Sequence, residues 1–134
     1  MISQQTQQAQ NKTISDWLFA VEQGGLSLPR FQRGEAWNYQ TIFTAMKAVI
    51  DGLPLGSFLV LANQGDQKFV ARPLSTAPEL KTTTGYLLDG QQRLTAIYRV
   101  LKNNYSARKF YIDANDPYNL KLVMEESGFA WGLI

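Results

Sequence analysis

A junction between a short apolar segment and a helix constrains this chain more than any other stretch of its sequence. Residues 85–88 are mostly apolar, the run Asp89-Gly90-Gln91-Gln92-Arg93 follows, and from Leu94 the apolar residues recur at helical spacing. We therefore expect a strand that ends at the acid and a helix that begins at once. The first N–H groups of a helix have no acceptor within it and its dipole is positive there, so the junction suits an anion such as a phosphate.

Each polar residue of the junction has a predicted role in phosphate binding and an ordinary structural alternative. Gly90 lets a ligand approach the backbone closely, Arg93 can bind a phosphate through two hydrogen bonds, and Asp89 can hold a hard cation such as Mg²⁺. Alternatively, Asp89 is only a helix N-cap and Gly90 a turn residue. Gln91 and Gln92 can equally be plain first-turn residues. A positive charge in the first helical turn is mildly unfavourable, so Arg93 fits better with an anion in front of it.

A second polar segment, Pro29-Arg30-Phe31-Gln32-Arg33, follows a short extended stretch. The functional interpretation assigns Arg33, with Arg30 beside it, to phosphate and Gln32 to a base or a metal-bound water. Phe31 would then stack or line a pocket. The structural alternative is a solvated basic loop with Phe31 in the core. Trp37 is expected in the core or in a pocket wall rather than as a stacking platform for bases.

The composition excludes several kinds of active site. The chain has no histidine and no cysteine, which excludes a Ser-His-Asp triad, an HNH-type nuclease centre and a zinc site. A metal would need oxygen ligands, as magnesium and manganese do. With 13 basic and 11 acidic residues, the net charge of +2 is too small to indicate nucleic-acid binding by itself.

The length of 134 residues allows one domain with one modest core. Residues 1–12 are polar and rich in glutamine, and they are predicted to form a flexible tail before a domain at 13–134. No apolar run approaches the roughly 20 residues of a membrane span and no signal peptide is visible, so a cytoplasmic protein without membrane contact is expected. The apolar end, residues 129–134, indicates a fragment of a longer protein or, alternatively, a terminus docked on the core.

Apolar spacing and capping residues predict the remaining helices. One helix is expected at 13–23, capped by Thr13 with Asp16 three residues later, and another at about 39–51, capped by Asn38. Asp116-Pro117 predicts the start of a third helix that runs to about residue 126. The helix after the junction should present Leu94, Ile97, Tyr98 and Leu101 on one face.

Short apolar runs predict the strands. We expect a buried strand at 58–61 and further strands at 68–71 and 108–112, with an exposed loop at 72–84. Because helices and short strands are interspersed, the sequence indicates an α+β or mixed α/β class.

The two polar segments occur together in the order and approximate spacing of a known family. Its pattern has Pro-x-Tyr-Gln-Arg, a Trp, a helix ending in Gly-x-Pro, an apolar strand, and Asp-Gly-Gln-Gln-Arg-Leu. The matching parts of this chain are Pro29 to Arg33, Trp37, Gly52 to Pro54, 57–61 and Asp89 to Leu94. Over about residues 13–112 the chain resembles the N-terminal domain of GmrSD-type modification-dependent restriction and phage-defence proteins. Phe31 departs from the pattern and lacks the hydroxyl of the family's tyrosine.

This resemblance implies a fold, a ligand and a set of roles. The fold would be α+β and ParB/sulfiredoxin-like, a small mixed sheet with helices packed around it. The domain would bind and hydrolyse a nucleoside triphosphate (NTP) with Mg²⁺. Asp89 would position the metal or the attacking water, and Gly90, Gln91, Gln92 and Arg93 would cradle the phosphates. Arg33 would approach from the opposite loop with Gln32 beside it, since phosphoryl transfer needs mainly positioning and charge neutralisation.

Three functions follow from these observations. The first is an NTP-binding, NTP-hydrolysing regulatory domain of a bacterial restriction protein, which couples nucleotide state to recognition or cleavage of modified DNA. The HNH-type nuclease half would lie elsewhere in the full-length protein. The second is a ParB-like DNA-binding or nuclease module in which the same arginines contact DNA phosphates, with salt-dependent affinity for duplex. The third is a domain that only scaffolds a partner.

Overall fold

A four-stranded mixed sheet carries the strand that leads into the junction. The computed structural model describes residues 9–63, 65 and 69–126, and there the strand order is β2-β4-β1-β3. The central strands β1 (Leu26–Pro29) and β4 (Gly85–Asp89) pair in parallel. The edge strands β2 (Leu59–Ala62) and β3 (Ala71–Arg72) pair antiparallel to β4 and β1. The sheet and three helices confirm the α+β class among the described residues.

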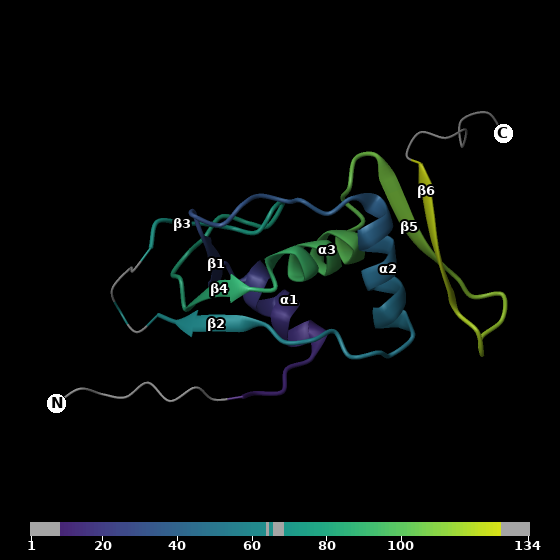
Figure 1. Ribbon diagram of the computed structural model, residues 1–134, viewed down its shortest axis with the longest axis horizontal. Helices are drawn as coiled ribbons and strands as arrows, with labels where there is room; N and C mark the ends of the chain where they lie inside the picture. The colour runs from purple at the N-terminus through teal and green to yellow at the C-terminus, as the bar shows by residue number, and fades with distance from the viewer. Residues whose placement is uncertain (1–8, 64, 66–68, 127–134) are drawn as a thin grey trace.

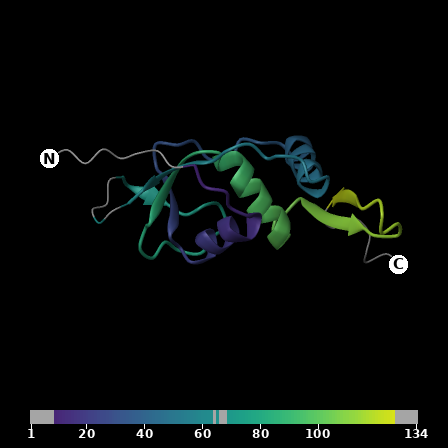
Figure 2. The same ribbon diagram turned by 90° about the horizontal axis from the view of Figure 1, so that it is seen from below.

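Three helices begin at the positions that the sequence predicts. In α1 (Ile14–Glu22), Thr13 and Asp16 form a reciprocal capping box, and in α2 (Tyr39–Ile50) the Asn38 side chain accepts from the backbone N–H of Thr41. The third helix, α3 (Gln91–Lys102), follows β4 directly. Figures 1 and 2 both show α3 in the middle of the molecule, with the sheet on one side and α2 on the other.

Two apolar clusters lie on opposite sides of α3. The first joins α3 to the sheet and α1, and its buried members are Val21, Leu26, Leu28, Leu74, Leu87, Leu94 and Tyr98. The second joins α3 to α2 and to the C-terminal hairpin, and its buried members are Ile42, Met46, Ala96, Ile97, Val100, Tyr105 and Phe110. Because most residues of α3 are buried, this helix is fixed from both sides.

The predicted helix from Asp116 to residue 126 is wrong. The chain there forms a hairpin of β5 (Arg108–Asp113) and β6 (Lys121–Glu126), which lies at the end of the molecule beyond α2 (Figure 1). Asp116 closes the turn, since its carboxylate accepts from the Tyr118 N–H at 3.0 Å. Leu122 and Met124 pack against the second cluster, a spacing of two that belongs to a strand.

Three other expectations also need correction. The strand at 58–61 was expected to be buried, but among the described residues β2 pairs with a strand on one edge only, and Leu59 is 46% exposed. The loop at 72–84 is not wholly exposed, because Leu74 is only 1% exposed within the first cluster. Leu101 does not share the apolar face of α3 and is 53% exposed.

Some predictions fall partly outside the described residues. Of the strand expected at 68–71, the structure has β3 at Ala71–Arg72, and residue 68 is not described. Residues 1–8 of the expected tail and the apolar end at 129–134 also lie outside. Within the described ranges, no helix is long and apolar enough to cross a membrane.

A polar contact between α1 and α3 makes the stability of the domain depend on pH. The Lys102 ammonium lies 2.7 Å from Glu22 Oε1, and the Tyr98 hydroxyl donates to the same oxygen at 2.8 Å. The hydrogen bond from Lys102, and then that from Tyr98, lower the pKa of Glu22. Burial, with the adjacent Glu22, raises the pKa of Tyr98 to about 12.

We expect Glu22→Gln to lower the melting temperature at pH 7 and to have less effect as the pH falls. A carboxylate with a lowered pKa stabilises the fold above its unfolded value of about 4.3 and loses this effect as pH drops through the folded value. Thermal unfolding of wild type and variant between pH 7 and pH 3 measures the difference. Glu79→Gln is the matched control, since Glu79 is exposed and makes no ion pair with a described residue. A pH-independent deficit in Glu22→Gln would contradict this account.

Candidate functional site

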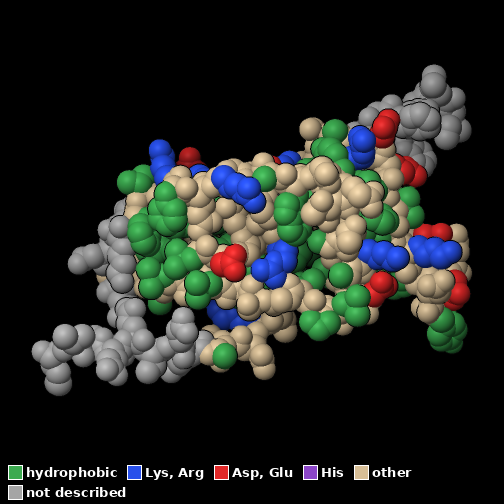
Figure 3. Space-filling model, in the orientation of Figure 1, with side chains coloured by type: hydrophobic (Ala, Val, Ile, Leu, Met, Phe, Trp, Pro, Cys, Tyr) green, Lys and Arg blue, Asp and Glu red, His purple; other side chains and the backbone are tan. Residues whose placement is uncertain are grey.

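The two polar segments meet at a cavity of about 370 Å³. It lies where β4 ends and α3 begins, and its walls are Gln32, Arg33, Trp37, Leu88, Asp89, Gly90, Gln91, Gln92 and Arg93. Figure 3 shows an acidic side chain with basic side chains around it in the middle of the face over this junction. The structure thus brings together residues about 60 positions apart that the sequence assigned to one site.

The amino end of α3 presents free backbone donors. Gly90 is the N-cap, with a left-handed backbone (φ 95°) and no side-chain cap hydrogen bond. The first amide to bond within the helix is that of Leu94, which donates to the Gly90 carbonyl at 3.0 Å. Among the described residues, the N–H groups of Gln91, Gln92 and Arg93 therefore have no acceptor. Three such donors at the positive end of a helix dipole are suited to an anion.

Asp89 is not the N-cap that the structural alternative proposed. It is the last residue of β4, and its carboxylate Oδ1 accepts from the Gly90 N–H at 2.9 Å, one residue before the helix. Of the residues that line the cavity, Asp89 alone is acidic. The described residues contain no group of three or more His, Cys, Asp or Glu that could hold a metal ion.

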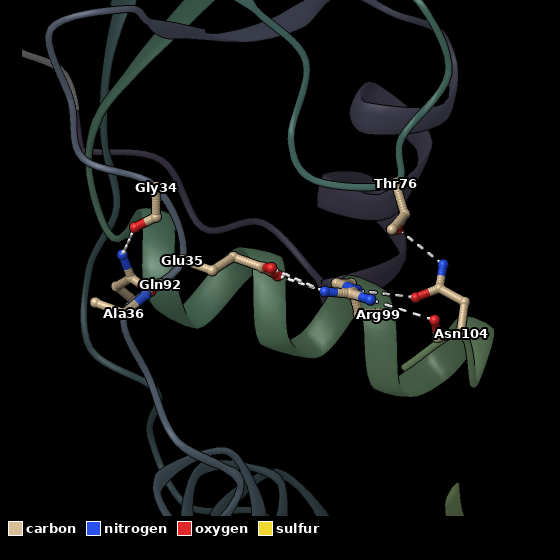
Figure 4. Close-up of polar contacts among 7 residues, drawn as sticks. All are labelled: Gly34, Glu35, Ala36, Thr76, Gln92, Arg99 and Asn104. Atoms are coloured by element: carbon tan, nitrogen blue, oxygen red, sulfur yellow. Dashed lines mark hydrogen bonds and ion pairs between the residues drawn. The ribbon is translucent and has the colours of Figure 1, made fainter. Parts of the chain in front are cut away.

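The two glutamines of the junction use their side chains to hold the facing loop. Gln91, which is buried, donates from Nε2 to the Arg33 carbonyl at 2.8 Å. Gln92 donates to the Gly34 carbonyl and accepts from the Ala36 N–H, both at 2.9 Å (Figure 4). The side chains thus fix the loop at 33–36. The backbone N–H groups of the same two residues, which line the cavity, have no acceptor among the described residues.

The Gln32 side chain joins its loop to strand β4. Its Nε2 donates to the carbonyls of Leu87 at 2.8 Å and Leu88 at 3.0 Å. The side-chain oxygen of Gln32 has no donor among the described residues. Gln32 therefore joins the loop to β4 and keeps only an acceptor for a ligand.

The three arginines assigned to phosphate occupy different environments. Arg93 donates to the carbonyls of Leu55 and, at 2.9 Å, Ser57, and its guanidinium lies 5.1 Å from the centre of the Phe58 ring. Arg33 is exposed, lines the cavity and forms no side-chain hydrogen bond or ion pair with the described residues. Arg30 is exposed and is not among the residues that line the cavity.

The two aromatic residues of this region, Trp37 and Phe31, occupy different environments. Trp37 forms part of the cavity wall and packs against the second apolar cluster, as expected. Phe31 is neither in the core nor in the cavity wall: it is 71% exposed and meets the edge of Phe69 with ring centroids 5.5 Å apart. The prediction of Phe31 in the core and that of Phe31 in a pocket wall were therefore wrong, whereas its stacking on a ligand stays a prediction.

An ion pair that was not predicted from the sequence holds the loop at 33–36 against α3. Arg99 on α3 binds both carboxylate oxygens of Glu35 at 2.8 and 2.9 Å (Figure 4). It also donates to the Asn104 side chain at 3.1 Å and lies 4.0 Å from the centre of the Tyr105 ring. Burial, and then the charge of Glu35, raise the pKa of Tyr105 to about 12. Glu35 and Arg99 are 64 residues apart, so no periodic pattern links them.

The fold and the cavity define a small α+β domain with an open helix terminus at a strand-to-helix junction. The family model described as the N-terminal domain of the GmrSD restriction endonuclease matches residues 14–129, and the chain belongs to this family. The chain is also 30% identical over 118 residues to an uncharacterized protein of Methanocaldococcus jannaschii, a match that covers 78% of this chain. It spans 20% of that protein's length. No solved structure matches the chain, so the ParB/sulfiredoxin-like fold stays a prediction.

Gly90 should tolerate no side chain. From the sequence, this glycine was explained by the close approach of a ligand, whereas the structure explains it by the Phe58 ring and the left-handed backbone. A β-carbon there would lie 2.9 Å from Cε1 of Phe58 and overlap the ring, and the left-handed backbone would be strained. We expect Gly90→Ala to destabilise the domain by about 1–2 kcal/mol through the backbone and by a further ~1–3 kcal/mol through overpacking. Urea unfolding measures this loss.

Gly34→Ala is the control in the facing loop, because a β-carbon at Gly34 would meet no atom of the described residues within 4 Å. It should change stability by less than about 0.5 kcal/mol. In a Phe58→Ala background, which lacks the ring, Gly90→Ala should cost only the backbone part of the loss, measured against Phe58→Ala alone. Equal stability of the two glycine variants would show that Gly90 is not constrained as described.

Proposed function

We propose that this domain binds a nucleoside triphosphate in the cavity at the β4–α3 junction and hydrolyses it with Mg²⁺. The observation that carries the proposal is the set of three unpartnered N–H groups of Gln91, Gln92 and Arg93 at the amino end of α3. A chain of phosphates carries the charge and the acceptor oxygens that such a terminus binds. A cavity of about 370 Å³ lies in the range of small-molecule sites.

In this proposal Arg33 supplies the mobile positive charge. Its guanidinium is exposed, lines the cavity and has no partner among the described side chains and carbonyls, so a bidentate contact with phosphate would break no existing bond. Arg93 already bonds two carbonyls. Its part in phosphate binding would come from its backbone N–H and from the guanidinium hydrogens that those bonds leave free.

Asp89 is the residue that would hold Mg²⁺ or orient the attacking water. One oxygen of its carboxylate accepts from Gly90, and the other has no partner among the described residues. Magnesium in nucleotide sites commonly has one or two carboxylate ligands and completes its coordination with phosphate and water, so a single acid suits the ion. When bound, the ion would neutralise charge on the phosphates. Gln32 lines the same cavity, and its side-chain oxygen would accept from the water.

The proposed role in the full-length protein is regulation of DNA restriction. The family takes its description from a restriction endonuclease, and this chain has no histidine for an HNH-type centre. Cleavage of DNA would then belong to another part of the protein, and nucleotide state in this domain would control recognition or cleavage. The net charge of +2 does not favour the alternative of a DNA-binding module.

Arg33→Ala should weaken NTP binding without lowering stability. Loss of hydrogen bonds to a charged group costs about 1.5–3 kcal/mol, so the Kd should rise roughly 10- to 100-fold. Isothermal titration with each of the four NTPs and Mg²⁺ measures the affinity, and thermal unfolding without nucleotide measures the fold. Arg30→Ala is the matched control, since Arg30 lies three residues away, is exposed and stays outside the cavity.

Two results would contradict the proposed function. The first is a wild-type protein that binds no NTP. The second is an equal loss in Arg30→Ala and Arg33→Ala together with salt-dependent binding of duplex DNA, which would indicate a basic DNA-binding surface. Arg93→Ala is a poorer probe, because it also removes the hydrogen bonds that hold Leu55 and Ser57.

A further inference from the structure

A second cavity lies beside the first and shares one wall with it. Its volume is about 340 Å³, and it is lined by Trp37, Gln40, Thr41, Thr44 and Ala45. All but Trp37 belong to the first two turns of α2. Trp37 lines both cavities, so a ligand that extends from the amino end of α3 past the indole reaches the exposed face of α2.

The second cavity differs from the first in its chemistry. The Thr44 hydroxyl donates to the Gln40 carbonyl at 3.0 Å and the Thr41 hydroxyl donates to the Asn38 side chain at 2.9 Å. Because both hydroxyls bond within the helix and its cap, the walls consist mainly of the indole, methyl groups and the Ala45 side chain. The exposed amide of Gln40 forms no hydrogen bond with the described residues, so it can donate and accept.

We propose that the second cavity binds the nucleobase of the nucleotide, an inference that rests on the proposed function. A nucleobase is flat, with apolar faces that stack on indole and a polar edge that pairs with a side-chain amide. The paired cavities match the two ends of a nucleotide: the first has Arg33 and the helix amides for phosphate, and the second has Trp37 and Gln40 for the base. A phosphate-only ligand would leave the second cavity without an occupant.

The indole is held in place by the same contacts that build the first cavity. Trp37 packs against the second apolar cluster, and the N–H of Ala36, one residue earlier, donates to Gln92 at 2.9 Å. Glu35, two residues before Trp37, forms an ion pair with Arg99 at 2.8 Å. The wall between the two cavities is therefore positioned before a ligand arrives, which reduces the entropy lost on binding.

The test separates the base from the phosphates by using two probes. Thr44→Trp fills the second cavity from an exposed position on α2, and Lys47→Trp adds the same ring to an exposed position of that helix outside the cavity. Each protein is titrated with inorganic tripolyphosphate and with the four NTPs, all with Mg²⁺. We expect Thr44→Trp to weaken binding of the preferred NTP at least tenfold and to leave tripolyphosphate binding unchanged. Lys47→Trp should alter neither.

The outcomes distinguish this inference from the proposed function. Wild type that binds tripolyphosphate as tightly as every NTP, or Thr44→Trp that binds NTP normally, would overturn the base site and keep the phosphate site. Wild type that binds neither probe would overturn both. A Gln40→Leu variant adds a readout of specificity: it should reduce the differences in affinity among the four NTPs without changing tripolyphosphate binding.

Discussion

Burial of α3 on two sides is the constraint on which the rest of the structure depends. The helix contributes residues to both apolar clusters, one against the sheet and α1 and the other against α2 and the hairpin. Its amino end therefore has a fixed position relative to β4 and to the facing loop. Donors that are fixed before a ligand binds cost no reorganisation, which is the condition for strong electrostatic stabilisation of an anion.

The polar residues Gln91, Gln92 and Arg93 of the junction use their side chains to hold neighbouring segments, and their backbone N–H groups stay unpaired among the described residues. The side-chain amides of Gln91 and Gln92 hold the loop at 33–36, and the guanidinium of Arg93 holds the segment before β2. Their backbone N–H groups have no acceptor among the described residues. One short sequence thus assembles the walls of the cavity and provides its donors, so fold and site cannot be varied independently at these positions.

Local signals allowed much of this domain to be predicted, and contacts between distant residues explain what was missed. The caps Thr13 and Asn38 mark two helices because their hydrogen bonds span three residues. The hairpin was mistaken for a helix because Asp116-Pro117 resembles a helix start, whereas the register that forms β6 is set by pairing with β5. The pairing of Glu35 with Arg99 and the partners of Arg93 depend on the tertiary fold. The fold brings the predicted site residues other than Arg30 to one cavity, but the different contacts of their side chains and backbone could not be predicted from the sequence.

The parallel pairing of β1 with β4 has a consequence for how the domain folds. Leu26 pairs with Gly85, so about 60 residues must be enclosed before these strands meet, and contacts of such separation form slowly. The loop at 33–36 and the amino end of α3 face each other only after this closure. The binding site for a ligand of the cavity would therefore be absent from early, partly folded chains. The ligand would lengthen the lifetime of the native domain by slowing unfolding and would leave the folding rate unchanged.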